Sequence, residues 1–228
     1  MVPYNSMSAI QKDFDRIALL SAGGSDNNNV YASFLLRRIP PNCVESLEIG
    51  CGTGAFSRLL AARSKRVLAI DLSPNMIRVA KSCSQQFDNI EFQVADVMKR
   101  DFPLNHFDNI VSIATLHHLP TEELLSKMKK TLKPGGTLII LDLVKAEGLS
   151  GAISAAAALP VSVALKLIST GRLREPREVR EAWAEHGRTD SYLTMSQVRQ
   201  TCGDILPGAE VRKHLLWRYS VIWKKPTE

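Results

Sequence analysis

Residues 44–61 read "VESLEIGCGTGAFSRLLA", which joins an apolar run and an acid to three glycines and then to a helical pattern. The glycines stand at alternate positions, Gly50, Gly52 and Gly54, although glycine is among the residues least favourable to a helix. Glycine adopts positive φ readily and lets a ligand approach the main chain, and a turn at a helix start directs free N–H groups outward. This stretch therefore predicts a ligand-binding turn between a strand and a helix.

The residues around the turn bear on which ligand it holds. Gly50, Gly52 and Ala55 satisfy the G-x-G-x-x-A form of the dinucleotide fingerprint, whereas the Gly-Lys-Ser/Thr end of a phosphate loop is absent. Glu48 precedes the glycines, and its carboxylate would repel a pyrophosphate but would suit a positively charged ligand without phosphate. At this point a nicotinamide dinucleotide and another adenosine-containing ligand both remain open.

Short apolar strand patterns alternate with helical patterns through the middle of the chain. The strands are expected at residues 46–50, 66–72, 90–96, 107–113 and 136–143. Helix signals lie between them: Ser73 as N-cap with Pro74 next, and Thr121 as N-cap of a helix that stops at Gly135 and Gly136. Because several apolar runs are nearly continuous, the pattern predicts a Rossmann-like, doubly wound α/β sheet whose parallel strands are covered on both faces.

Helical regions and a strand pair flank this alternation. Thr194 and Gln197 form a capping box in the later helical region, and residues 210–216 and 218–224 are expected to pair as antiparallel strands. We expect residues 1–228 to form a single domain. Its parts are an N-terminal helical cap (1–42), a cofactor-binding core (43–144), an inserted helical lid (145–207) and a C-terminal strand pair (208–228).

The composition is that of a soluble globular protein, with 45% hydrophobic and 23% charged residues in a chain of 228. The net charge of +6 permits nucleic-acid binding without requiring it, because acidic residues interleave with most basic stretches. The four cysteines show no CxxC spacing and indicate neither a zinc site nor a disulfide framework. We expect a cytoplasmic protein, since the first residues lack the basic and apolar segments of a signal peptide.

The most apolar stretch, residues 148–171, does not predict a membrane span. It consists largely of Ala and Ser, contains Pro160 near its middle and reaches Lys166 soon after. We expect a buried helix or a lid helix there, broken at Pro160.

Acidic residues also end two of the expected strands. Asp71 closes the second strand, beside the first glycine turn in this fold, where a carboxylate accepts both hydroxyls of a ribose. Asp96 closes the third strand within "VADV", a place suited to an adenine amino group. Together with Glu48, these acids favour an adenosyl ligand that carries no phosphate.

Five stretches, in order, resemble the successive motifs of class I S-adenosylmethionine-dependent methyltransferases: "LEIGCGTGAFS", "AIDLSPNMIRVAK", "VADV", "FDNIVSIATLHHL" and "LKPGGTLIILDL". The resemblance is strong over residues 43–143 and weak over the closing strand pair. It implies a seven-stranded sheet whose last strand is antiparallel, and S-adenosyl-L-methionine as the cofactor. The arrangement is most similar to small-molecule methyltransferases, including those of quinone biosynthesis.

The resemblance also implies which residues contact the cofactor. Asp71 would hold the ribose hydroxyls, Asp96 would meet the adenine amino group, and Leu72 and Met76 would pack near the adenine. The small and apolar members of the set could instead serve only in core packing. The full set is Glu48, Gly50, Cys51, Gly52, Gly54, Asp71, Leu72, Met76, Ala95, Asp96, Val97, Ile113 and Ala114.

Methyl transfer from a sulfonium requires mainly that a nucleophile be aligned behind the methyl group and that water be excluded; a general base is needed only if the acceptor must lose a proton early. The candidate catalytic residues are His117 and His118, after the fourth strand, and Tyr31, in a segment that could close over the cofactor. One of the two histidines could instead brace the next helix. His186 is expected on the lid or the surface. "SIATLHH" lacks the extra carboxylate or amide ligands of a catalytic metal site, so we expect no metal.

The sequence thus predicts in-line transfer of a methyl group to a small-molecule acceptor in a partly apolar pocket, by a monomer or homodimer without a membrane span. An RNA or protein methyltransferase is the first alternative, motivated by a sequence pI near 9.2. A non-methylating S-adenosylmethionine-binding protein and a nicotinamide oxidoreductase are the others.

Overall fold

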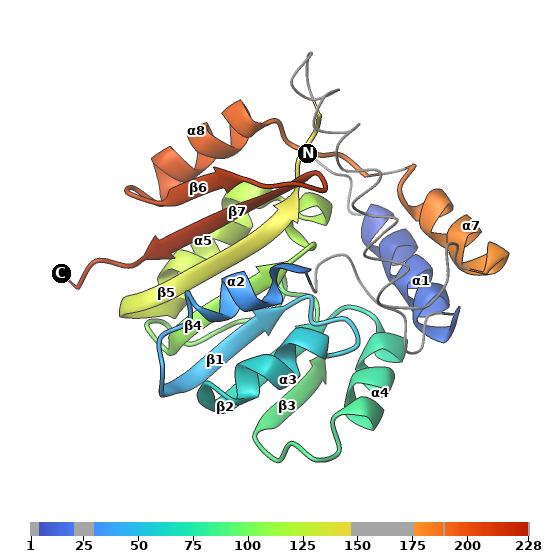
Figure 1. Cartoon of the computed structure of the whole chain (residues 1–228), viewed down its shortest axis with the longest axis horizontal. Helices are drawn as coiled ribbons and strands as arrows, with labels where there is room; N and C mark the ends of the chain where they lie inside the picture. Colours follow the sequence, from blue (N-terminus) through green and yellow to red (C-terminus); the bar gives the residue numbers. More distant parts are fainter. Residues whose placement is uncertain (1–4, 21–29, 147–175, 189, 228) are drawn as a thin grey trace.

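The computed structural model describes residues 5–20, 30–146, 176–188 and 190–227. Its centre is a seven-stranded sheet in the order β3-β2-β1-β4-β5-β7-β6 (Figure 1). Strands β1 to β5 pair in parallel, and β7 is antiparallel to both β5 and β6, which confirms the predicted doubly wound sheet with an antiparallel last strand. The strands are β1 (Cys43–Ile49), β2 (Ser64–Asp71), β3 (Ile90–Val94), β4 (Phe107–Ile113), β5 (Leu132–Leu143), β6 (Glu210–Lys213) and β7 (Arg218–Lys224).

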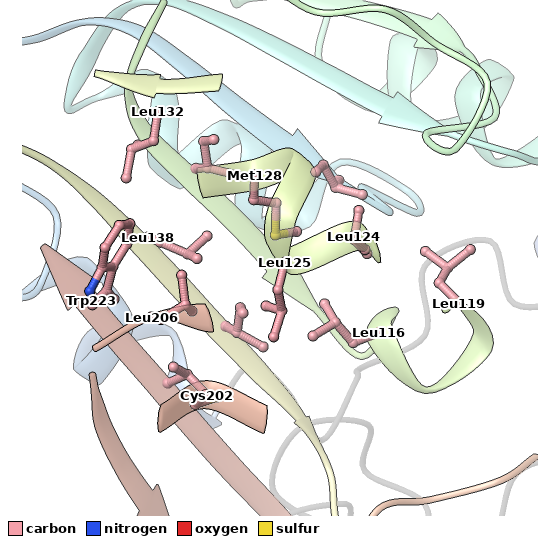
Figure 2. Packing of buried hydrophobic residues seen from close by; sticks show 14 of the residues in the cluster. Leu116, Leu119, Leu124, Leu125, Met128, Leu132, Leu138, Cys202, Leu206 and Trp223 are labelled. Carbon is pink, nitrogen blue, oxygen red and sulfur yellow. The ribbon is translucent and has the colours of Figure 1, made fainter. Parts of the chain in front are cut away.

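Helices cover both faces of the sheet, because its central strands alternate between two buried cores. Ile110 faces one core and Val111 the other, and Leu138 and Ile139 divide in the same way. The helices α2 (Ala32–Leu36), α3 (Ala55–Ala61) and α4 (Pro74–Cys83) pack on one face, and α5 (Thr121–Thr131) and α8 (Met195–Ile205) on the other. Figure 2 shows the leucines of α5 packed towards Leu206 and Cys202 from the segment around α8.

Two further helices, α1 (Asn5–Leu20) and α7 (Arg177–His186), lie beside each other beyond the carboxyl ends of the parallel strands (Figure 1). Their small core contains Ile17, Ala18 and Ala182, and it also takes in Met76 of α4. This pair therefore stands at the edge of the sheet where ligands bind in open α/β folds, close to the β1–β4 switch in strand order.

The helix signals in the sequence were right at two helix starts and wrong at the start of α5. Ser73 accepts a hydrogen bond from the Met76 N–H at 3.0 Å, and Thr194 forms the complete capping box with Gln197. Thr121, however, is the first helical residue of α5 and not its N-cap, because Pro120 takes that position.

The predicted glycine stop of α5 is also wrong. The helix ends at Thr131, and β5 begins at once with the fully buried Leu132, so that Gly135 and Gly136 lie inside the strand. Gly135 has φ +76° and its N–H donates to the Lys225 carbonyl at 2.8 Å. The two glycines thus shape the start of a strand next to the C-terminal segment.

In the later part of the chain, the described residues agree with what the sequence predicts. The predicted strand pair is present, although β6 ends at Lys213 and its connection to β7 carries positive φ at Leu216 and Trp217. The predicted break at Pro160 lies outside the described residues. Within the residues that the structure describes, no helix combines the length and apolar character that a membrane crossing needs.

Candidate functional site

The glycine turn, residues 50–54, joins β1 to α3 at the switch in strand order, and all three glycines have positive φ. A Cβ on Gly50 would fall 2.0 Å from the Thr115 hydroxyl, and one on Gly54 would fall 2.8 Å from the Phe92 ring. A Cβ on Gly52 would meet nothing within 4 Å. The outer glycines are therefore required by the packing of the protein itself, whereas Gly52 borders open space in which a ligand can reach the main chain.

Glu48 lies at the end of β1 and is only 2% exposed. The Ser57 hydroxyl donates to its Oε2 atom at 2.5 Å. Burial raises the pKa of Glu48 to about 8, against the opposing effect of the Ser57 hydrogen bond. A cation placed beside Glu48 would favour its ionised form, so this carboxyl group is suited to a positively charged ligand.

Asp71 ends β2 and points its carboxylate at the glycine turn. Its Oδ2 accepts the Gly52 N–H at 2.8 Å and its Oδ1 accepts the Ser73 N–H at 2.9 Å. Burial raises the pKa of Asp71, although both backbone hydrogen bonds act in the other direction. A carboxylate has about four lone-pair sites, so each oxygen keeps one acceptor site for a ligand hydroxyl.

Helix α1 reaches the same turn through Asp15. The Ser73 hydroxyl donates to Asp15 Oδ1 at 2.5 Å, and the Asn75 N–H donates to the same atom at 3.1 Å. The N-terminal helical region therefore packs on the segment that follows Asp71. Sequence reasoning did not identify Asp15, because an acid on an amphipathic helix usually faces solvent.

The remaining predicted cofactor residues line the carboxyl ends of the next strands or support them. The Ala95 N–H donates to the Asp71 carbonyl at 2.9 Å, and Asp96 accepts the Met98 N–H at 2.9 Å with its side chain 15% exposed. Val97 is buried in the core beneath α5. Met76 packs against α1 and α7, and Cys51 is buried beside the turn. Leu72 is only partly buried, at the carboxyl end of β2.

The end of β4 meets the glycine turn. Ala114 follows the strand with φ +51°, and its N–H donates to the Leu141 carbonyl at 2.7 Å. The next residue, Thr115, donates its hydroxyl hydrogen to the Ile113 carbonyl at 3.0 Å and presses its side chain on Gly50. Ile113 and Ala114 thus lie at the same edge as Glu48 and Asp71.

His117 is held by a carboxylate that sequence reasoning missed. Its Nδ1 lies 2.6 Å from Asp142 Oδ1, and its backbone N–H donates to Asp142 Oδ2 at 2.9 Å. Asp142 lies in β5 and is 1% exposed. The sequence signal that could have identified Asp142 is an acid inside an apolar run, "LIILDL", just as Glu48 stands in "SLEIG".

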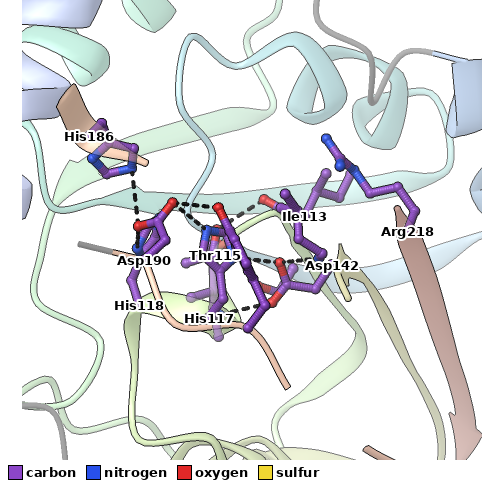
Figure 3. Close-up of polar contacts among 12 residues, drawn as sticks. Ile113, Thr115, His117, His118, Asp142, His186, Asp190 and Arg218 are labelled. Carbon is purple, nitrogen blue, oxygen red and sulfur yellow. Dashed lines mark hydrogen bonds and ion pairs between the residues drawn. The ribbon is translucent and has the colours of Figure 1, made fainter. Parts of the chain in front are cut away.

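Three histidines surround the carboxylate of Asp190 (Figure 3). His118 Nδ1 lies 3.3 Å from Asp190 Oδ1, and the Nε2 atoms of His117 and His186 each lie 3.9 Å from an Asp190 oxygen. Tyr192 also donates its hydroxyl hydrogen to Asp190 Oδ2 at 2.7 Å. We call His117, His118, His186 and Asp190 the histidine cluster.

Electrostatics in the histidine cluster favour charged Asp190 and neutral His118. Burial acts to raise the pKa of Asp190, but hydrogen bonds from His118 and Tyr192 outweigh it and hold this pKa at about 2. Burial lowers the pKa of His118 despite its contact with Asp190. His186 belongs to the region predicted as the lid but does not lie on the surface: it is 3% exposed, because α7 packs on α1 and brings the ring 4.6 Å from that of Phe14.

Tyr31 contacts a different part of the molecule. Its hydroxyl donates to the Leu215 carbonyl at 2.6 Å, and its ring stands 5.3 Å from the His214 ring. The structure therefore brings His117 and His118 together and places Tyr31 against the connection between β6 and β7.

Comparison with known proteins gives a consistent picture. Residues 47–140 match the family described as "Methyltransferase domain". An uncharacterized methyltransferase of Mycobacterium bovis is 30% identical over 209 residues, which are 88% of this chain and 97% of that protein. A demethylmenaquinone methyltransferase of Tropheryma whipplei is 31% identical over 144 residues, or 58% of each chain.

Solved structures share the fold. A putative methyltransferase of Haloferax volcanii, solved in complex with the Trm112 methyltransferase activator, has a TM-score of 0.70 at 17% identity and covers 96% of this chain and 98% of its own. A SAM dependent methyltransferase of Aquifex aeolicus has a TM-score of 0.58 at 19% identity, with 96% and 97% covered. At these identities the likeness concerns the fold alone.

Proposed function

Because this chain belongs to the S-adenosylmethionine-dependent methyltransferases, we propose that it transfers the methyl group to a small-molecule acceptor, with the cofactor bound at the glycine turn. The observation that carries this proposal is the geometry around Gly52. Open space borders its Cα, Asp71 accepts its N–H, and the buried Glu48 ends the strand that leads into the turn. A hydroxyl-rich, positively charged ligand matches these three features.

Each acid then has a separate role in cofactor binding. Asp71 accepts the ribose hydroxyls through the acceptor sites that its backbone partners leave free. Glu48 faces the positively charged methionine portion, and Asp96 receives the adenine amino group at the end of β3. The other proposed contacts are Gly50, Cys51, Gly52, Gly54, Leu72, Met76, Ala95, Val97, Ile113 and Ala114.

The bound cofactor supplies a sulfonium whose methyl group is already electrophilic. What remains for the protein is to align the acceptor for in-line displacement and to exclude water. The contact between Thr115 and Gly50 brings the loop after β4 to the glycine turn, and His117 and His118 follow directly in that loop. These two histidines are therefore proposed to border the acceptor, and Tyr31 stays a predicted gate.

A small acceptor is favoured over RNA or protein for two reasons. The similar protein of Tropheryma whipplei is named for demethylmenaquinone, a small molecule. In addition, acidic side chains pair with several basic ones on the described surface, as in Arg16 with Glu185 and Arg177 with Glu181. Such pairing reduces the attraction for a polyanion.

The experiment that tests this function follows labelled methyl groups from S-adenosylmethionine into a cell extract that has been separated into small molecules, RNA and protein. We expect label in the small-molecule fraction with the wild-type protein, and loss of that label with Asp71→Ala. Label confined to RNA or protein would contradict the proposed acceptor class. Transfer to none of the fractions would support the non-methylating alternative.

A further inference from the structure

The histidine cluster has the composition of a metal site. Ring nitrogens of three histidines converge on Asp190, at 3.3 Å from His118 and 3.9 Å from each of His117 and His186. All four side chains are at most 7% exposed. The cluster is therefore closed to bulk water, and its charges must be balanced from within.

Two of these histidines contact another carboxylate through Nδ1, the ring nitrogen that points away from Asp190. His117 Nδ1 lies 2.6 Å from Asp142 Oδ1, and His186 Nδ1 lies 3.2 Å from Asp13 Oδ2. Each of these carboxylates holds the Nδ1 edge of its ring, and the Nε2 edge of both rings faces Asp190, 3.9 Å away in each case.

We propose that the histidine cluster binds a divalent transition-metal ion of the Zn²⁺ type, through Nε2 of His117, Nδ1 of His118 and the carboxylate of Asp190. One ligand atom from each of these three residues lies within 4.8 Å of the other two. Imidazole nitrogen and carboxylate oxygen are ordinary zinc ligands, and a zinc ion with three protein ligands takes water or substrate as its fourth. Neighbouring ligand atoms of such a site lie roughly 3.3 Å apart, as Zn–N bonds of about 2.0–2.1 Å require. The separations from Asp190 are 3.3 Å to His118 and 3.9 Å to His117.

The surroundings of the site resemble those of bound metals. Histidine ligands of metals usually donate their other ring N–H to a carboxylate, and Asp142 provides this contact for His117. The expectation of no metal came from the absence of extra ligands near the fourth strand. The missing carboxylate is Asp190, which follows α7, far along the chain.

A metal at this position would join two parts of the molecule. His117 and His118 belong to the short 3₁₀ helix η2 (Leu116–His118) after β4, and Asp190 lies after α7. The ion would therefore hold the segment after α7 on the carboxyl edge of the sheet. It also changes the role of His117, because a ring nitrogen bound to a metal cannot accept a proton from the acceptor.

The test is titration of the full chain, after treatment with a chelator, with Zn²⁺ by calorimetry and with Co²⁺ by visible absorption. We expect one ion per chain, the strong absorption of tetrahedral Co²⁺, and a higher melting temperature. His118→Ala should weaken Zn²⁺ binding at least a hundredfold, and Asp142→Asn about tenfold to a hundredfold. His106→Ala, a histidine outside the cluster, is the control and should bind as the wild type does.

X-ray absorption of the zinc protein provides a readout that does not depend on variants. It should show two imidazole nitrogens and one carboxylate oxygen among the ligands of the ion. Absence of stoichiometric Zn²⁺ and Co²⁺ binding by the folded wild-type chain would overturn the proposal. Equal affinity in His118→Ala and His106→Ala would overturn it as well. Gly52→Ala, placed at the cofactor turn, should leave Zn²⁺ affinity unchanged.

Discussion

The glycine turn and the histidine cluster both place buried carboxylates at the carboxyl edge of one sheet, but the chain builds them in opposite ways. Glu48, Gly52, Asp71 and Ser73 follow one another through β1, the turn and β2, so the first site is local in sequence. The second draws its histidines and the acids that contact them from α1, η2, β5, α7 and the segment after α7. A local site exists once one βαβ unit folds, whereas the second requires α1 and α7 to dock.

The largest effect is expected at the local site, from Gly52→Ala. The new methyl group meets no protein atom but enters the space assigned to the cofactor, so S-adenosylhomocysteine affinity should fall at least a hundredfold by calorimetry. Gly208→Ala is a matched control, because Gly208 also has positive φ and open space. Each variant should cost stability by about 1 kcal/mol through backbone strain. Equal cofactor affinity in the two variants would remove the turn from the binding site.

Glu48→Gln probes the charge at the local site through the pH dependence of stability. The folded pKa of about 8 lies above the ordinary value of 4.5, so the native state holds a proton that the unfolded state has lost between these values. The contribution of Glu48 to the stability of the ligand-free protein is therefore fully present below about pH 4.5 and is lost as pH rises towards 8, by at most about 1.4 kcal/mol per pH unit.

Urea unfolding at several pH values measures this dependence. In Glu48→Gln the contribution of this residue disappears, and the fall between these pH values should be shallower than in the wild type. Identical pH profiles for the two proteins would mean that Glu48 ionises as readily in the folded chain as in the unfolded one.

A smaller effect is expected in the histidine cluster, from Tyr192→Phe. This change removes the hydroxyl that donates to charged Asp190, and hydrogen bonds to charged groups contribute about 1.5–3 kcal/mol. Tyr31→Phe removes a hydrogen bond to a neutral carbonyl, worth about 0.5–1.5 kcal/mol. Urea unfolding at neutral pH in the presence of a chelator should rank Tyr192→Phe as the more destabilised. The reverse order would indicate that Asp190 is balanced mainly by the histidines.

The same contrast explains what could be predicted from the sequence. The glycine turn and the acids at strand ends are readable because each lies at a fixed place in a strand–turn–helix pattern. The pairing of Asp142 with His117 was missed because it requires β5 to lie beside β4 in the correct register. The burial of His186 was missed because nothing in "WAEHGR" shows that α7 packs against Phe14 of α1. The prediction of Thr121 as the N-cap of α5 was wrong for a local reason, since Pro120 adopts the extended N-cap conformation.

The central claim is that Asp71 holds the adenosyl cofactor at the glycine turn. Calorimetric titration of Asp71→Ala with S-adenosylhomocysteine tests it most directly, with Asp88→Ala, an exposed acid between α4 and β3, as the control. We predict that binding is lost in Asp71→Ala and retained in Asp88→Ala, while the circular dichroism of both variants matches the wild type. Unchanged affinity in a folded Asp71→Ala would contradict the account.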